Sequence, residues 1–201
     1  VGSEMCIRDS LCISLSDLAE RASETGSESR LYDALDHFRC CKDNDIETFL
    51  RKNAFEFINR GWCSVYLIVD EAAFDAGEIK IDAYFTLSHK SLIPENVSKS
   101  KIKSASGDKD SKSLHFVLIG QLGKYIEKLP DGTELRAGIA SGEILDYAFE
   151  VIRASNSLIP CRCALVECSE EPKVQKAYTD YEFKFFQYDR DGGHYQFYKR
   201  I

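Results

Sequence analysis

The apolar positions of the chain repeat with helical spacing in its first quarter. Between Asn44 and Gly61 they fall on one face of a helix, and Gly61 marks its end. Asn44 followed three residues later by Glu47 is typical of a capping box. Residues 14–36 predict one or two shorter helices broken around Gly26. The apolar face of the clearest helix consists of Ile46, Phe49, Leu50, Ala54, Phe57 and Ile58.

Strand-like spacing follows these helices. Residues 62–69, WCSVYLIV, are β-branched and aromatic and end at an acidic turn, as a buried strand does. Residues 79–88 alternate apolar and polar positions and predict its hairpin partner. Residues 94–113 contain five lysines and almost no apolar side chains, which predicts a mobile Lys/Ser-rich loop inserted between strands. Because the rest of the chain is acidic, this basic loop is the place where an anionic substrate would be steered.

The second half alternates strands and helices. Residues 114–122 predict a central strand covered on both faces, and residues 130–132 a turn. A helix is expected from Gly142 onward. A further strand, a short helix and a closing hairpin complete the pattern, and the order predicts a mixed α/β fold. These last elements are expected at residues 161–168, 173–181 and 183–200, with the hairpin turn at 191–193.

Length and charge narrow the classes of function. The 201 residues suit one domain, expected over residues 11–201. The opening VGSEMCIRDS resembles a translated sequencing adapter, so residues 1–10 are set aside as a non-native extension. The net charge of −7 argues against general nucleic-acid binding. No apolar run reaches the roughly 20 residues of a membrane span, and no secretory signal is evident, so a cytoplasmic location without membrane contact is expected.

The cysteines and histidines do not predict a metal site. The eight cysteines include no CxxC pair, and Cys161 and Cys163 are spaced to share one face of a strand. The four histidines are scattered without ligand spacing. We therefore predict reduced thiols that pack as small apolar side chains, and no metal.

The strongest chemical signal is the segment RAGIASGEIL, where a loop of small residues opens a helix. Gly138, Ala140, Ser141 and Gly142 leave room for backbone N–H groups to close on an anion, and the helix N-terminus adds partial positive charge. The same residues would equally suit a helix that packs tightly against a strand, so both interpretations stay open on the residues alone. The spacings of a Walker loop and of a dinucleotide fingerprint are absent.

Residues 37–200 resemble the GNAT acyltransferase family. The family's cofactor loop, Q/R-x-x-G-x-G/A, is similar to the segment in which Gly138 and Ala140 take the small positions, although Arg136 lies one place closer to Gly138 than the pattern asks. HFRCCKDNDIETFLRKNAFEF and DAYFTLS resemble segments of the toxin-like GNAT branch, and AYTDYEF is similar to the family's FYEKNGF segment. The resemblance implies a mostly antiparallel central sheet flanked by helices and acetyl-CoA as co-substrate.

The resemblance also implies roles for individual residues. The diphosphate of acetyl-CoA would bind the backbone around Gly138, and the thioester would lie beside the end of the central strand. Tyr178 would be the general acid for the departing thiolate, and Glu167 would accept the proton of the amine. The implied cofactor-binding residues are Leu122, Gly123, Lys124, Arg136, Ala137, Gly138, Ile139, Ala140, Ser141 and Gly142.

Several functions remain open from the sequence. The first is an N-acetyltransferase that moves the acetyl group of acetyl-CoA to a primary amine by direct attack. Within it, the toxin-like branch implies aminoacyl-tRNA as acceptor, with the basic loop as contact. The second is a non-catalytic binding module of the same fold. A homodimer is compatible with either.

Overall fold

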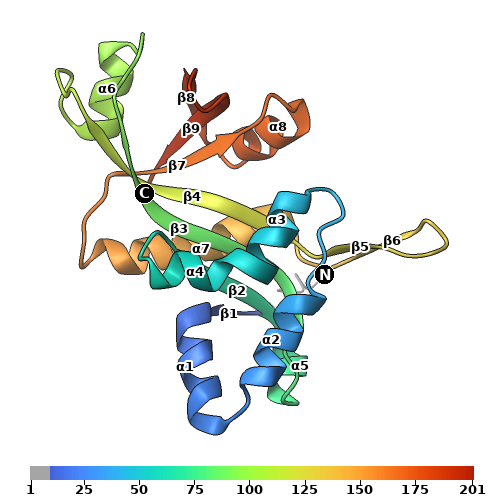
Figure 1. Cartoon of the computed structure of the whole chain (residues 1–201). Helices are drawn as coiled ribbons and strands as arrows, with labels where there is room; N and C mark the ends of the chain where they lie inside the picture. The colour runs from blue at the N-terminus through green and yellow to red at the C-terminus, as the bar shows by residue number, and fades with distance from the viewer. Residues whose placement is uncertain (1–9) are drawn as a thin grey trace, which may run out of the picture. The chain divides into compact units, whose positions relative to one another are not determined.

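The computed structural model describes residues 10–201, so nine of the ten adapter-like residues lie outside the description. Seven strands form one sheet in the order β1-β2-β3-β4-β7-β9-β8, and β5 pairs with β6 in a separate hairpin (Figure 1). The strands are β1 (Ser10–Ser14), β2 (Ser64–Asp70), β3 (Ile81–Leu92), β4 (Leu114–Lys124), β5 (Ile126–Lys128), β6 (Glu134–Arg136), β7 (Cys163–Cys168), β8 (Lys184–Asp189) and β9 (His194–Arg200). The helices are α1 (Leu15–Thr25), α2 (Glu28–His37), α3 (Asn44–Thr48), the π-helical turn η1 (Phe49–Asn53), α4 (Ala54–Asn59), α5 (Glu71–Asp75), α6 (Lys99–Ser106), α7 (Ser141–Asn156) and α8 (Pro172–Asp180).

The predicted mixed α/β architecture is confirmed. The β1–β2, β7–β9 and β8–β9 pairs are antiparallel, whereas β4 and β7 run parallel. The chain divides into two compact units, and both β3 and β4 contribute residues to each unit. The first unit holds the described residues up to Phe85 together with Leu122–Ile139, and the second holds Thr86–Gln121 and Ala140–Ile201.

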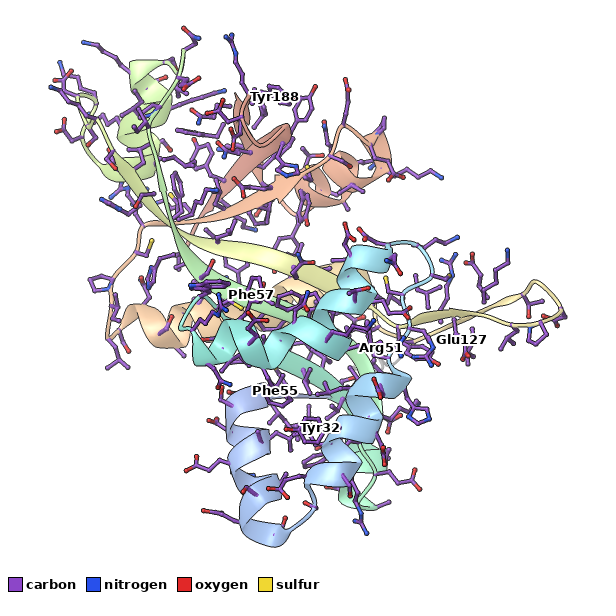
Figure 2. All side chains as sticks on the ribbon, viewed as in Figure 1. Tyr32, Arg51, Phe55, Phe57, Glu127 and Tyr188 are labelled. Atoms are coloured by element: carbon purple, nitrogen blue, oxygen red, sulfur yellow. The ribbon has the colours of Figure 1, made fainter. Side chains whose placement is uncertain are left out.

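In the first unit, α1, α2 and the helical run from α3 to α4 build an apolar core with β1 and β2. Tyr32 of α2 packs against Phe55 of α4 with 5.5 Å between ring centroids (Figure 2). Tyr84 is fully buried, and its hydroxyl donates a hydrogen bond to the Ile46 carbonyl at 2.7 Å. This hydrogen bond fixes the ring in the core, because a buried phenol without a partner would be costly.

The helix predicted from Asn44 is present, but its cap differs from the prediction. Asp43 is the N-cap, and its carboxylate accepts hydrogen bonds from the Asp45 and Ile46 amides. Glu47 reaches back past the cap to the Cys40 amide at 2.8 Å. Aspartate is as good a cap as asparagine and lies one residue earlier, so the start was ambiguous in the sequence.

In the second unit, α6 packs against a buried cluster of the sheet, and Phe149 of α7 contacts the rings of Tyr181 and Phe183, which follow α8. Leu114 and Phe116 of β4, Leu165 of β7 and Phe186 of β8 belong to a buried cluster that also includes Ala105 of α6. The β8–β9 hairpin was predicted, and its register shifts between Phe185 and Gln187 as at a β-bulge.

The segment 94–113 corrects a prediction, because it contains the helix α6 rather than only a loop. Ser98 caps the helix by accepting from the Lys101 amide at 3.4 Å, and Gly107 ends it at φ 92°. Ile102 and Ala105 are three residues apart and pack against the core of the second unit. Two well-placed apolar residues and two caps are therefore enough to order a segment whose composition is mostly polar.

The three short strands β1, β5 and β6 were also missed. Residues 10–14 form β1, which pairs with β2 from Ser10↔Asp70 to Ser14↔Tyr66. The predicted turn at residues 130–132 is present, and it joins β5 to β6 (Figure 1). The seven cysteines in the described part of the chain form no disulfide with one another, and all but Cys41 are buried or half-buried. Among the described residues, no helix is long and apolar enough to cross a membrane.

Candidate active site

The small-residue loop that enters α7 is open on its outer side. Neither Gly138 nor Gly142 has a positive φ, so neither position needs glycine for its backbone conformation. A Cβ atom built at either residue would meet no heavy atom of the described residues within 4 Å. Tight packing therefore does not explain these two glycines, and the packing interpretation left open by the sequence does not hold at these positions. What the missing side chains leave is free access to the backbone.

The backbone amides of this loop divide into two groups. The Ala137 amide donates to the Tyr125 carbonyl at 3.1 Å, and the Ala140 amide donates to the Glu143 carboxylate at 2.6 Å. Within the described part of the chain, the amides of four other residues have no hydrogen-bond acceptor, and two of these begin α7. These four are Gly138, Ile139, Ser141 and Gly142. Four free donors at a helix N-terminus are an arrangement suited to an anion.

Glu143 opposes this arrangement by its charge. Its carboxylate lies in the first turn of α7, where the helix dipole stabilises negative charge. Because it accepts from the Ala140 amide, it satisfies a donor that a bound anion would otherwise meet. An incoming diphosphate would therefore compete with Glu143 for the same end of the helix.

The end of β4 meets the same loop. The Lys124 ammonium donates a hydrogen bond to the Ile139 carbonyl. Gly123 is required by packing, because a Cβ there would come within 2.5 Å of the Tyr84 ring and 2.6 Å of Ile46. Leu122, one residue earlier, is half-buried. Lys124 thus holds the loop by its side chain, while Gly123 brings the strand backbone close to the core.

Arg136 is occupied by its own hairpin. Its guanidinium binds the Glu134 carboxylate at 2.5 Å, and Glu134 also pairs with Lys42. These partners lower the pKa of Glu134, mainly through the hydrogen bond from Lys42 and then that from Arg136. Arg136 and Glu134 share one face of β6 because they are two residues apart. In this structure the arginine is exposed and paired with Glu134, a carboxylate that it shares with Lys42.

Tyr178 lies in α8, in contact with residues that link α8 to α7. Its ring packs edge-on against Phe183 at 5.7 Å, and Phe183 lies 5.9 Å from Phe149 of α7. The Tyr181 hydroxyl ties the same helices together by donating to Asp146 at 2.5 Å. Burial, and to a smaller extent the Cys168 thiol, raise the pKa of Tyr178 to about 12. Tyr178 is therefore a neutral phenol throughout the physiological pH range.

Glu167 of β7 is held by two partners. Gln196 donates to one carboxylate oxygen at 2.6 Å, and the Lys90 ammonium lies 3.3 Å from the same oxygen. Gln196 is fully buried, and its own side-chain oxygen has no hydrogen-bond partner among the described residues. A carboxylate in such a cluster is well fixed, but its two donors compete with any proton it would accept. The role of Glu167 as a proton acceptor remains a prediction.

Comparison with solved structures finds bacterial toxins of similar fold. No protein-family model and no curated protein sequence matches the chain. AtaT complexed with acetyl-methionyl-tRNAfMet is 17% identical at a TM-score of 0.66, and the match covers 96% of this chain and 95% of that one. A tyrosine-to-phenylalanine variant of KacT is 14% identical at a TM-score of 0.66, covering 96% of this chain and 95% of the other. AtaTR bound with acetyl-CoA gives 14% identity and a TM-score of 0.62 over 96% of this chain and 94% of that one.

The chain has the GNAT fold. The fold expected from the sequence resemblance is thereby confirmed over nearly the whole chain. The roles of the small-residue loop and of Tyr178 remain predictions, and sequence reasoning assigned no role to Glu143 or Gln196, which contact the candidate site residues Ala140 and Glu167. The signal for Glu143 was its place three residues after Ala140, where a capping carboxylate sits. Nothing in the sequence marked Gln196. In residues 10–201 no group of three potential ligands is placed to hold a metal ion.

Proposed function

We propose that the protein is an N-acetyltransferase that moves the acetyl group of acetyl-CoA to a primary amine. The open loop at the start of α7 carries the proposal, because free amides and uncovered glycines fit a diphosphate. The fold adds support, since AtaTR was solved with acetyl-CoA and AtaT with an acetylated methionyl-tRNA.

In the proposed reaction, the diphosphate of acetyl-CoA binds the free amides of Gly138, Ile139, Ser141 and Gly142. An amide near Leu122 and Gly123 of β4 polarises the thioester carbonyl. The amine nitrogen attacks the carbonyl carbon, the carbon–sulfur bond breaks, and the amine loses one proton, with Glu167 or water as acceptor. Lys124 keeps the loop in place through the Ile139 carbonyl.

The raised pKa of Tyr178 determines how this residue would assist departure of the thiolate. A thiol of the cysteine type has a pKa of about 8.5, so complete proton transfer from a phenol whose pKa is about 12 is uphill. The neutral hydroxyl would first donate a hydrogen bond to the departing sulfur and stabilise its developing charge. Solvent then restores any proton that leaves the phenol. Two of the similar toxins, AtaT and KacT, were themselves solved as tyrosine-to-phenylalanine variants.

A tyrosine pair tests this role. Acetyl-CoA binding is measured by calorimetry, and turnover by release of the coenzyme A thiol with a panel of amines and aminoacyl-tRNAs. Tyr178→Phe is expected to slow turnover by about 100-fold or more at unchanged acetyl-CoA affinity. The matched control is Tyr181→Phe, which removes a hydroxyl bound to Asp146 and should change turnover by less than about threefold.

Two outcomes separate the proposal from its rivals. If acetyl-CoA does not bind at millimolar concentration, the chain is a non-catalytic module of the same fold. If it binds and Tyr178→Phe turns over at the normal rate, the reaction does not use this tyrosine.

The acceptor we favour is the amino group of an aminoacyl-tRNA. The observation behind this choice is the complex of AtaT with acetyl-methionyl-tRNAfMet, whose fold this chain shares over most of its length. An acetylation assay that compares aminoacyl-tRNA with the free amino acid tests the choice. Equal rates with both would point to a small-molecule enzyme.

A further inference from the structure

A cavity of about 510 Å³ is lined by residues of the second unit, none of which belongs to the proposed acetyl-CoA site. One wall is formed by the chain leading into α6, including Ser98, and by Lys101 in the first turn of that helix. The other wall is the edge strand β8 with its continuation to Arg190. All of its lining residues belong to the second unit. The cavity is therefore a feature of one compact part of the chain.

Hydrogen bonds fix the wall that faces β8. The buried Gln187 side chain accepts from the Glu95 amide at 3.0 Å and donates to the Ile93 carbonyl at 3.4 Å. Asn96 completes the turn at φ 54°, in the left-handed region that asparagine tolerates better than most residues. The oxygen and the nitrogen of the Gln187 side-chain amide thus both hold the backbone of this wall in place.

Two aromatic side chains that line the cavity are exposed to solvent. Phe185 is 42% exposed and Tyr188 is 44% exposed, although both lie on a strand of the central sheet (Figure 2 labels Tyr188). Tyr195 packs behind Tyr188 at 4.8 Å between ring centroids, so the ring is supported from one side. Two supported rings that face solvent are a surface on which a flat heterocycle stacks.

The cations at the cavity are not neutralised. Lys101 lies over the Phe185 ring at 5.2 Å, and within residues 10–201 neither Lys101 nor Arg190 has an ion-pair partner. Lys99, two residues before Lys101 on the same helix, does pair with Asp110 at 3.3 Å. Glu95 is the one carboxylate in the lining, so the lining carries a net positive charge in a chain of net charge −7.

We propose that this cavity binds a nucleoside phosphate, either a free nucleotide or the end of a single-stranded RNA. The base stacks on Tyr188, and the phosphate pairs with Arg190 and with Lys101, which lies over the neighbouring Phe185 ring. The N-terminus of α6, which Ser98 caps, adds positive potential at the same wall. Stacking and unpaired cations together distinguish a nucleotide from a purely apolar ligand and from a plain anion. The site goes beyond the proposed acetyl-transfer reaction and does not depend on it.

Binding is tested with AMP, adenosine, inorganic phosphate and a four-nucleotide adenylate, each by saturation-transfer NMR and calorimetry. The titrations are repeated on the Gly138→Ala variant, in which the proposed acetyl-CoA loop is altered, so that nucleotide binding at that loop is distinguished from binding at this cavity. AMP or the oligonucleotide should bind at least about tenfold more tightly than adenosine or phosphate alone, since each alone lacks one of the two contacts. Preference between AMP and the oligonucleotide identifies the natural source.

Matched variants connect binding to this cavity. Lys101→Gln and Tyr188→Ala should each weaken binding by about fivefold or more, since each removes one contact worth about 1 kcal/mol. Lys99→Gln, on the same helix but paired with Asp110, and Tyr32→Ala, an exposed tyrosine of the first unit, should leave affinity within about twofold. Thermal unfolding confirms that all four variants are folded.

Absence of nucleotide binding, or binding that depends on general charge alone, would overturn the inference. If AMP does not bind at about 10 mM and the oligonucleotide does not bind at about 1 mM, the cavity is not a nucleotide site, because dissociation constants above these values correspond to only about 3–4 kcal/mol of binding free energy. Equal effects of Lys101→Gln and Lys99→Gln would assign any binding to general charge. Gly138→Ala distinguishes failure here from failure of the acetyl-CoA site, because it alters the loop of α7 and not this cavity.

Discussion

Replacing Gly138 by alanine separates ligand binding from folding at the proposed diphosphate loop. The new methyl group would meet no atom of the described protein within 4 Å, and the backbone does not need a positive φ. Because alanine restricts the unfolded chain, the free energy of unfolding should rise by about 0.4–1 kcal/mol. For a chain of this size that corresponds to a melting temperature higher by roughly 1–4 °C.

Gly138→Ala should weaken acetyl-CoA binding even though it stabilises the fold. The methyl group would stand where a phosphate oxygen approaches the free amides, and each hydrogen bond to a charged group contributes about 1.5–3 kcal/mol. Loss of one such bond predicts roughly 10- to 100-fold weaker binding. Calorimetric titration of acetyl-CoA measures the affinity, and thermal unfolding without ligand measures the stability.

Gly123→Ala is the matched contrast. Its Cβ would come within 2.5 Å of the buried Tyr84 ring and 2.6 Å of Ile46, so the core must shift. Overpacking of this kind destabilises by about 1–3 kcal/mol, a melting temperature lower by several degrees. If Gly138→Ala instead binds acetyl-CoA within twofold of the parent protein while remaining folded, no diphosphate sits on that backbone and the reasoning fails.

Three further variants probe the charges of the site. Glu143→Gln removes the carboxylate that competes with a diphosphate at α7 and should tighten acetyl-CoA binding by about threefold to tenfold in a titration, whereas weaker binding would contradict the competition. Glu167→Gln should lower turnover at least about tenfold if the carboxylate accepts the amine proton, and an unchanged rate would exclude it. Burial raises the pKa of Tyr178 to about 12, so the folded state holds this proton more tightly than the unfolded state. The parent protein should therefore lose up to about 2–3 kcal/mol of stability relative to Tyr178→Phe as the pH rises from 10 to 12, and parallel denaturation curves across that range would refute the burial of this phenol.

The fold was predictable where one apolar face repeats over many residues. The helix after Asn44 and the strand before Asp70 are both of this kind, because their apolar residues have a single consistent spacing. α6 was missed because its core contacts come from two residues, Ile102 and Ala105, and the composition of the segment as a whole is polar. β1 was missed because residues 10–14 are too few to show a period, and their strand exists through pairing with β2.

The open backbone of the candidate loop could be predicted from the sequence, whereas the side-chain pairings around it could not. Small residues before a helix reveal an open loop without any knowledge of the tertiary structure. The packing role of Gly123 depends on Tyr84, which is 39 residues away in the chain, and no local pattern contains it. The pairing of Arg136 with Glu134 is a local contact, visible once residues 134–136 are known to be a strand.

The position of α6 in the chain has an evolutionary consequence. It is inserted between β3 and β4, which are neighbours in the sheet, so the strand order does not depend on its length. Lengthening such a connection twofold adds only about 0.6 kcal/mol of closure free energy. Selection can therefore rebuild one wall of the nucleotide cavity, or delete it, while leaving the α7 loop and Tyr178 untouched. The shape of that wall is therefore free to change while the strand order of the sheet stays the same.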